Sequence, residues 1–184
     1  MIKDKVKNRD IQNIDDDIIR AKRIIREKLF EDEDIIAALH NVELEKNEAP
    51  PDEYFGVNIF SYVRVPGVQD EVRNFICFSV DDIEDLDYNR ALKYQHIEFV
   101  VFCNAKDIVT EYGIDRHDLI SFLIRDIFNW SNMLGMQLKL VYNRESVTDT
   151  DFYVRTIKFE AVQPNSLQKG VMNNRYEFDT YRRS

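Results

Sequence analysis

The chain has 184 residues, 44% of them hydrophobic and 12% aromatic, and this balance excludes a disordered, fibrous or low-complexity protein. Asp and Glu total 34 against 25 Lys and Arg, and the net charge of -9 disfavours non-specific binding to DNA. No stretch approaches the roughly 20 apolar residues needed to cross a bilayer, so no membrane role is expected. We predict a single domain over residues 1–162, with a flexible basic N-terminus (1–9) and an extended C-terminal tail (163–184).

The N-terminal quarter is predicted to be helical. Apolar residues lie on one stripe of an amphipathic helix, at Ile14, Ile18, Ala21, Ile25 and Leu29. The acidic runs 15–17 and 31–34 suit the first turns of this helix and of a second helix, or a bent continuation, that leads to Leu39. Residues 43–53 carry two prolines and many charges, which predicts a solvated connector.

Strand patterns follow the connector. A broken alternation over 57–65 and an apolar run over 72–80, separated by a Pro-Gly pair, predict an antiparallel hairpin with a loop of about six residues. Residues 81–90 are predicted to be an acidic loop. The β-branched and aromatic run 96–103 predicts a central strand.

A helix and two further strands complete the predicted domain. Asp115 is predicted to cap a helix that ends at Gly135 as its C-cap and has one apolar stripe, formed by Leu119, Leu123, Ile127 and Trp130. Strands are predicted over 136–142 and 153–161, paired with each other, and the polar segment 144–151 between them is predicted to be an exposed loop or a β-arm. The predicted fold class is α+β: a mixed, mainly antiparallel sheet packed by helices on one face.

No motif indicates catalysis or a cofactor. The five glycines are isolated, and the sequence contains neither a phosphate-binding loop nor a nucleophile elbow. Cys77 and Cys103 lie in apolar runs and are interpreted as buried, reduced thiols. The protein is therefore predicted to be no enzyme and to have no cofactor.

The spacing of the three histidines does not indicate a metal site. His40, His96 and His117 lie on different predicted elements, without the spacing of a helix-borne zinc site. Asp115, His117 and Asp118 could form an acid–base cluster, but a helix start attracts these residue types for capping alone, and capping is the preferred interpretation. No metal is predicted.

Four segments, 53–81, 96–108, 112–130 and 138–162, together resemble proteins of the tail-and-neck module of tailed phages and prophages. Within that module the chain is most similar to the tail terminator, also called the tail-completion or head–tail joining protein. The resemblance implies a structural virion protein whose small α+β subunits form a hexameric ring. Such a ring caps the tail tube, stops its polymerisation and joins the tail to the head connector.

The resemblance also implies location and partners. The protein would be assembled in the host cytoplasm and lie at the head–tail junction of the virion. Its partners would be further copies of itself, the tail tube protein and the head–tail connector protein. Genomic DNA would pass through the lumen without specific binding, and an acidic chain suits that passage.

The family has no catalytic residues to carry over, so the candidate residues are contacts. A ring needs a heterologous interface, which a β-arm or a terminal tail can supply. Subunit contacts are predicted in the arm, at Arg144, Glu145, Asp149 and Tyr153. Partner contacts are predicted in the tail, at Arg175, Tyr176 and Phe178. The alternative for all of them is plain surface.

Two other functions remain open from the sequence. One is a different neck or connector protein of the same junction. The other is a non-viral adaptor whose acidic loop and aromatic tail recognise a basic partner. Oligomeric state separates the classes, because a terminator predicts closed rings whereas an adaptor predicts a monomer or dimer.

Overall fold

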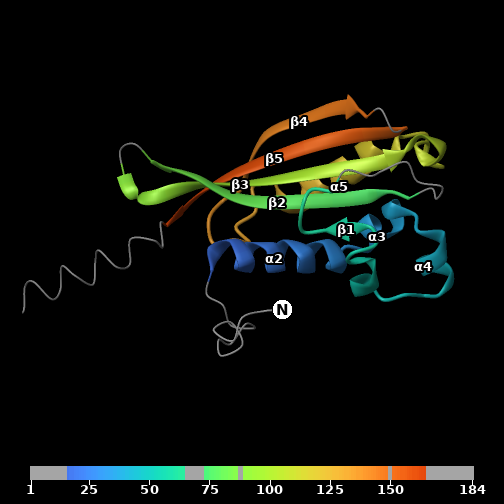
Figure 1. The fold of residues 1–184 in the computed structure, drawn as a ribbon, viewed down its shortest axis with the longest axis horizontal. Helices are drawn as coiled ribbons and strands as arrows, with labels where there is room; N and C mark the ends of the chain where they lie inside the picture. Colours follow the sequence, from blue (N-terminus) through green and yellow to red (C-terminus); the bar gives the residue numbers. More distant parts are fainter. Residues whose placement is uncertain (1–15, 65–72, 87–88, 149–150, 165–184) are drawn as a thin grey trace, which may run out of the picture.

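The computed structural model describes residues 16–64, 73–86, 89–148 and 151–164 (Figure 1). Its centre is a five-stranded sheet with the strand order β1-β2-β3-β5-β4. The strands are β1 (Ile59–Phe60), β2 (Phe75–Leu86), β3 (Asn89–Asn104), β4 (Lys139–Val147) and β5 (Phe152–Pro164). β1 pairs with β2 in parallel, and the other three neighbouring pairs are antiparallel. The predicted mixed, mainly antiparallel sheet is confirmed, with β3 at its centre.

The helices pack on one face of this sheet, as predicted. They are α2 (Asp17–Glu31), α3 (Glu33–Leu39), α4 (Val42–Lys46) and α5 (Arg116–Phe128), with the 3-10 turns η2 (Pro51–Tyr54) and η3 (Ala105–Asp107). In Figure 1, α2 runs alongside β2, and α5 lies behind β3 and β5. The α+β fold class is therefore confirmed.

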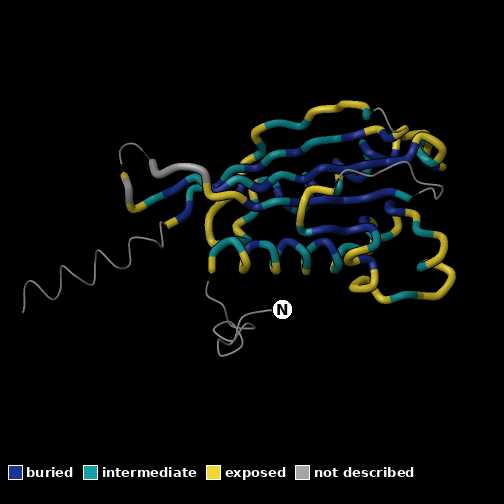
Figure 2. Tube along the Cα trace, in the orientation of Figure 1, coloured by how far each residue is buried: buried dark blue, intermediate teal, exposed yellow. Residues whose placement is uncertain are grey.

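Alternating burial along the strands places the main core between the sheet and the helices (Figure 2). Phe99 of β3 is fully buried and is the centre of an aromatic group. Its ring centroid lies 4.8 Å from that of Phe128 in α5 and 5.9 Å from that of Phe159 in β5. Tilted and edge-to-face rings add to the stability gained by burial, so this group fixes α5 against the two central strands.

A smaller cluster lies on the opposite face of the sheet. It contains Phe60, Phe75, Cys77, Val100, Phe102, Phe152 and Val154. Cys77 belongs to this cluster, whereas Cys103 belongs to the main core, and both are buried and free. Burial raises the pKa of both thiols, which matches the predicted packing role.

The acidic runs begin the two N-terminal helices, as predicted. Asp16 Oδ1 accepts a hydrogen bond of 3.0 Å from the Ile19 amide, and Asp32 Oδ1 accepts one of 2.9 Å from the Ile35 amide. Asp32 is also the C-cap residue of α2, so the chain turns there into α3. Ala21, Ile25 and Leu29 of the predicted stripe are buried, and Ile14 lies outside the described residues.

We expect the change Asp32→Ala to lower the free energy of unfolding by about 1 kcal/mol, the usual cost of removing an N-cap side chain. Chemical denaturation measures the loss. Glu27→Ala on the exposed side of α2 is the matched control, and its effect should stay within about 0.5 kcal/mol. Equal losses in the two variants would contradict the capping role.

The predicted hairpin of 57–65 with 72–80 is wrong. β1 contains two residues and pairs with β2 in parallel, with Ile59 opposite Ile76. A buried asparagine sets this pairing, because the Asn58 side chain donates to the Asn74 carbonyl at 2.8 Å and the Asn58 carbonyl accepts from the Ile76 amide at 2.8 Å. The predicted Pro-Gly turn lies outside the described residues.

The predicted acidic loop 81–90 is also wrong, because β2 and β3 stay paired almost to their shared end. Asp82 accepts hydrogen bonds from Lys93 and Gln95 on the opposite strand. Burial disfavours the Lys93 charge, but its bonds to Asp82 and Asp17 outweigh burial and raise the pKa of this ammonium. Cross-strand pairing thus makes an acidic segment compatible with a strand.

Both predicted caps of α5 need correction. Asp115 is the N-cap residue of α5, but its side chain makes no capping hydrogen bond. The helix ends at Phe128, where Asn129 is the C-cap, and Gly135 lies in a later turn with a φ of +89°. Trp130, predicted on the buried stripe, is 58% exposed, because its amide bonds to the Leu138 carbonyl and the chain turns toward β4.

The predicted pairing of the last two strands is confirmed, but β4 begins three residues later than predicted and ends five residues later, and β5 is longer at both ends. The loop or arm predicted for 144–151 is wrong for 144–147, because β4 continues to Val147 and Glu145 pairs with Arg155 of β5; residues 149–150 lie outside the described residues. The ribbon that projects from the body is instead the far end of β2 and β3, which passes the start of α2 (Figure 1). β5 runs to Pro164, two residues into the predicted tail; the remaining tail lies outside the described residues.

Candidate assembly surface and polar clusters

β4 forms an edge of the sheet that no described strand covers. It pairs with β5 on one side and ends the strand order on the other. Val141 is 51% exposed and Val147 is 70% exposed. An edge strand presents backbone donors and acceptors to any chain that can add a further strand. β4 is therefore a candidate surface for contact with another subunit.

The structure places three of the predicted contact residues. Arg144 lies on β4, and its guanidinium carbon is 4.7 Å from the Tyr142 ring centroid. Glu145 of β4 and Tyr153 of β5 lie close to His117 of α5, on the helix side of the sheet. Each of these three lies in a paired strand and not in a protruding arm, and their contact with another subunit stays a prediction. The described residues do not include Asp149, Arg175, Tyr176 and Phe178.

A charged cluster joins the first turn of α5 to β4 and β5. The His117 side chain is only 2% exposed, and its Nε2 lies 3.4 Å from Glu145 Oε1 and 3.9 Å from Asp118 Oδ1. Arg155 of β5 contacts the carboxylates of both Asp118 and Glu145. Neither ring nitrogen of His117 has a hydrogen-bond partner in the described part of the chain.

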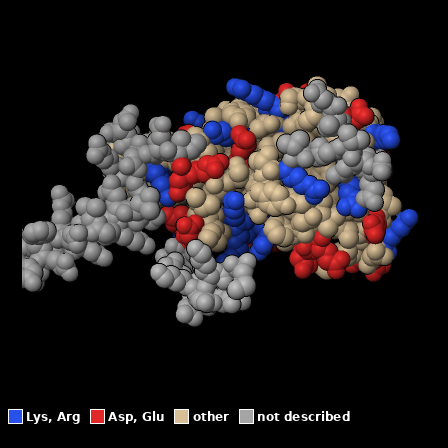
Figure 3. Space-filling model, in the orientation of Figure 1, with Lys and Arg blue, Asp and Glu red and all other residues tan. Residues whose placement is uncertain are grey.

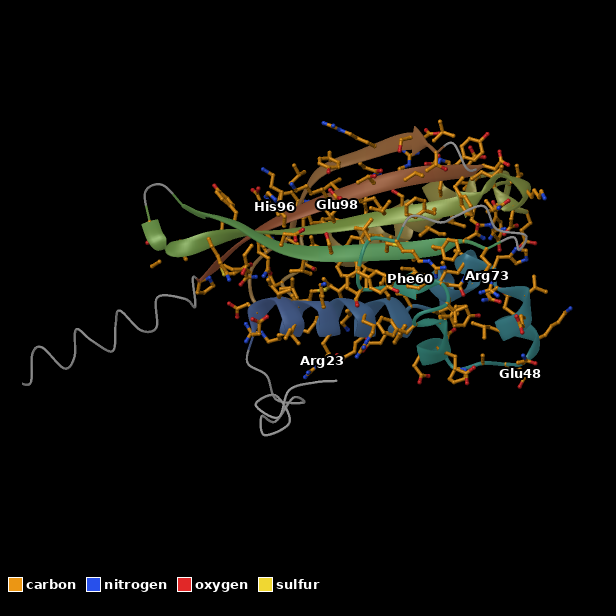
Figure 4. All side chains as sticks on the ribbon, in the orientation of Figure 1. Arg23, Glu48, Phe60, Arg73, His96 and Glu98 are labelled. Atoms are coloured by element: carbon orange, nitrogen blue, oxygen red, sulfur yellow. The ribbon has the colours of Figure 1, made fainter. Side chains whose placement is uncertain are left out.

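A second set of polar pairs lies on the sheet face turned away from α5, where Figure 4 labels His96 and Glu98. The His96 ring nitrogen Nε2 lies 2.9 Å from Glu160 Oε2. Tyr142 donates its hydroxyl to Glu98 Oε2 at 2.7 Å. Burial and this hydrogen bond raise the pKa of Tyr142 to about 12. The first pair connects β3 to β5, and the second connects β3 to β4.

Tyr142 should make the protein less stable as the pH rises from about 10 to about 12. The phenol ionises near its ordinary value of 10.0 in the unfolded chain but at about 12 in the folded one. Its contribution is therefore fully present below pH 10 and is lost as the pH rises through the folded pKa. Urea midpoints measured across this window check the decline, which Tyr142→Phe should make shallower; an unchanged slope would contradict the assignment.

A buried polar network connects α3, η3 and α5 at the start of β2. Arg116 of α5, 7% exposed, donates to the Ala38 carbonyl at 3.0 Å and to the carbonyl and Oδ1 of Asp107 at 2.7 and 3.0 Å. Asn74, fully buried, donates to the Leu39 carbonyl and to Asp107 Oδ2. The network thus ties α3, η3 and α5 to the start of β2. Sequence reasoning missed it, although an Asn beside the apolar run of β2 was an available signal.

A groove opens beside this network, between α3, α5 and the 108–115 loop. It holds about 560 Å³. Its lining includes the apolar Val109, Leu119 and Leu123 and the acidic Asp34 and Glu111. We call it the α3–α5 groove.

On the molecular face seen in Figure 3, acidic and basic side chains are interspersed in small groups over the described surface.

The fold and these surfaces define a small α+β protein built on a mixed sheet whose edge strand β4 has no described strand on its outer side. Across the described ranges, no helix combines the length and apolarity needed to span a membrane. The YomW family model matches residues 32–161, which run from the N-cap of α3 into β5. The chain belongs to the YomW family, a phage-derived family of the SPBeta-like prophage type. No curated protein matches the chain.

Proposed function

We propose that the chain is a structural virion protein of a tailed phage. In this proposal it is the tail terminator, which caps the tail tube as a hexameric ring and joins the tail to the head connector. The observation that carries the proposal is membership of a phage-derived family over residues 32–161. The resemblance of the same region to tail-and-neck proteins supports the more specific role.

The open edge of β4 supplies a surface suited to ring closure. Head-to-tail contacts between identical subunits close into a ring when each subunit offers two different surfaces related by a rotation. Strand addition to an exposed sheet edge is one such contact. The projecting end of β2 and β3 offers a second surface, distant from β4 in the strand order (Figure 1).

The remaining parts of the proposal follow from this role. The protein is no enzyme, and its partners are the tube protein, the connector protein and further copies of itself. It is assembled in the host cytoplasm and lies at the head–tail junction. Genomic DNA passes through its lumen without specific binding, and the net charge of -9 supports this because acidic surfaces repel phosphates.

One observation favours a different role as an adaptor. The α3–α5 groove is lined by apolar side chains and by three acidic ones, Asp34, Asp107 and Glu111, beside Arg116 and His40. This lining suits a segment that carries both apolar and basic side chains. Another neck or connector protein of the same junction would share the phage family and the sheet edge. Symmetry and position in the particle separate the three roles.

The native mass of the purified chain tests the proposal. Light scattering on a sizing column across a range of concentrations, followed by negative-stain imaging, should show closed rings of six copies. A discrete dimer or a monomer that binds basic peptides would favour the adaptor. Rings with a different copy number that bind the connector but not the tube would favour another neck protein.

A further inference from the structure

The charged cluster at the start of α5 has the composition of a metal site. Asp115, His117 and Asp118 place one donor atom each within 4.8 Å of one another. Glu145 of β4 lies next to this group of three, and its Oε1 is 3.4 Å from His117 Nε2. We propose that these four side chains bind a divalent transition-metal ion between α5 and the β4 edge.

The imidazole is the strongest indication of a ligand. His117 is 1% exposed, yet neither Nδ1 nor Nε2 has a hydrogen-bond partner in the ranges that the structure describes. Buried polar atoms without a partner are rare, because leaving water without a replacement bond is unfavourable. Nε2 points toward the carboxylates of Asp118 and Glu145, at 3.9 and 3.4 Å. A metal ion held there would satisfy this nitrogen.

The carboxylates lie at the solvent side of the imidazole and give an ion access to it. Asp115 is exposed, and the side chains of Asp118 and Glu145 are 41% and 55% exposed. Asp115 lies at the N-cap of α5, but its side chain makes no capping hydrogen bond. Its carboxylate can therefore bind an ion without losing such a bond. Ligands about 2.1 Å from one ion lie roughly 3 to 4 Å apart, and a small side-chain adjustment brings Asp115 into that range.

The charge of the cluster fits a divalent ion. The three carboxylates carry three negative charges, and Arg155, which contacts Asp118 and Glu145, supplies one positive charge. Two negative charges therefore remain for an ion to balance. A mixed set of one imidazole nitrogen and several carboxylate oxygens favours Zn²⁺ or Mn²⁺ over Ca²⁺ and Mg²⁺, which prefer oxygen alone.

Calorimetric titration of the chelator-treated full chain with Zn²⁺ tests the site, with Mn²⁺ and Mg²⁺ titrated in parallel. We expect one Zn²⁺ per chain, weaker binding of Mg²⁺, and a melting temperature that rises with Zn²⁺ concentration, because an ion bound to the folded state stabilises it. His117→Gln and Asp115→Asn should each weaken Zn²⁺ binding by about tenfold or more. Asp115 is exposed, so its variant tests the site even if His117→Gln fails to fold.

His40→Gln is the matched control. His40 also contacts a carboxylate, with its Nδ1 3.0 Å from Asp107 Oδ2, but its side chain is 44% exposed and belongs to the network around Arg116. Its replacement should leave the Zn²⁺ affinity unchanged. Absence of Zn²⁺ binding would overturn the proposal, as would binding that survives Asp115→Asn but is lost in His40→Gln. Neither result depends on the oligomeric state, so the test is independent of the proposed function.

Discussion

Replacing Arg116 by Met should lower the free energy of unfolding by about 3–5 kcal/mol, as expected when one partner of a buried ion pair is removed. The guanidinium makes three hydrogen bonds, to the Ala38 carbonyl and to two oxygens of Asp107. Met keeps the packing of the stem but leaves these acceptors without their donor. Urea denaturation followed by circular dichroism measures the loss.

Arg144→Met is the control for this change. Arg144 lies exposed on β4 with its guanidinium over the Tyr142 ring, and such an exposed contact contributes about 1 kcal/mol or less. Similar losses in the two variants would show that the network around Arg116 does not hold α3, η3 and α5 together.

Changing Val147 to Asp should abolish ring assembly while leaving the subunit folded. Val147 is 70% exposed on the open edge of β4, so the substitution should cost the isolated subunit about 1 kcal/mol or less. In a ring closed through this edge, the new carboxylate would be buried against the neighbouring subunit without a partner, which is far more costly. Light scattering should therefore report a monomer with an unchanged circular dichroism spectrum.

Val109→Asp controls for the added charge. Val109 is exposed to almost the same extent, 68%, but lies beside the α3–α5 groove instead of on β4. This variant should still form rings. Rings in the Val147→Asp variant would exclude the β4 edge as the subunit contact, and loss of rings in both variants would point to a general charge effect.

Local patterns in the sequence predicted the main elements of the fold. The helical spacing of Ala21, Ile25 and Leu29 correctly identified the buried face of α2. The β-branched and aromatic run 96–103 correctly identified the central strand, and its part from Phe99 to Cys103 is buried on both faces. These signals depend on residues near one another in the chain.

The errors arose where distant residues decide the structure. The acidic segment after Val80 is a strand because Lys93 and Gln95 bond to Asp82 across the ladder. The parallel pairing of β1 depends on Asn58, which bonds to a residue 16 positions away. No local pattern reports such partners, so the sequence suggested a loop and a hairpin there.

The candidate site was predicted in part. Asp115, His117 and Asp118 were recognised as a group but interpreted as capping residues; Asp115 is indeed the N-cap residue of α5, but its side chain makes no capping hydrogen bond. Glu145 and Tyr153 were selected for a protruding arm, yet pairing between β4 and β5 places them beside His117. The sequence could not show this meeting, because it depends on how α5 packs against the sheet.

The most direct test of the terminator role is polymerisation of the cognate tail tube protein with and without this chain. We expect the protein to stop tube growth and to appear in electron micrographs as a ring on one end of each tube. Val147→Asp should fail to stop growth, and Val109→Asp should behave as the wild type. Tubes of unchanged length with bare ends would contradict the account.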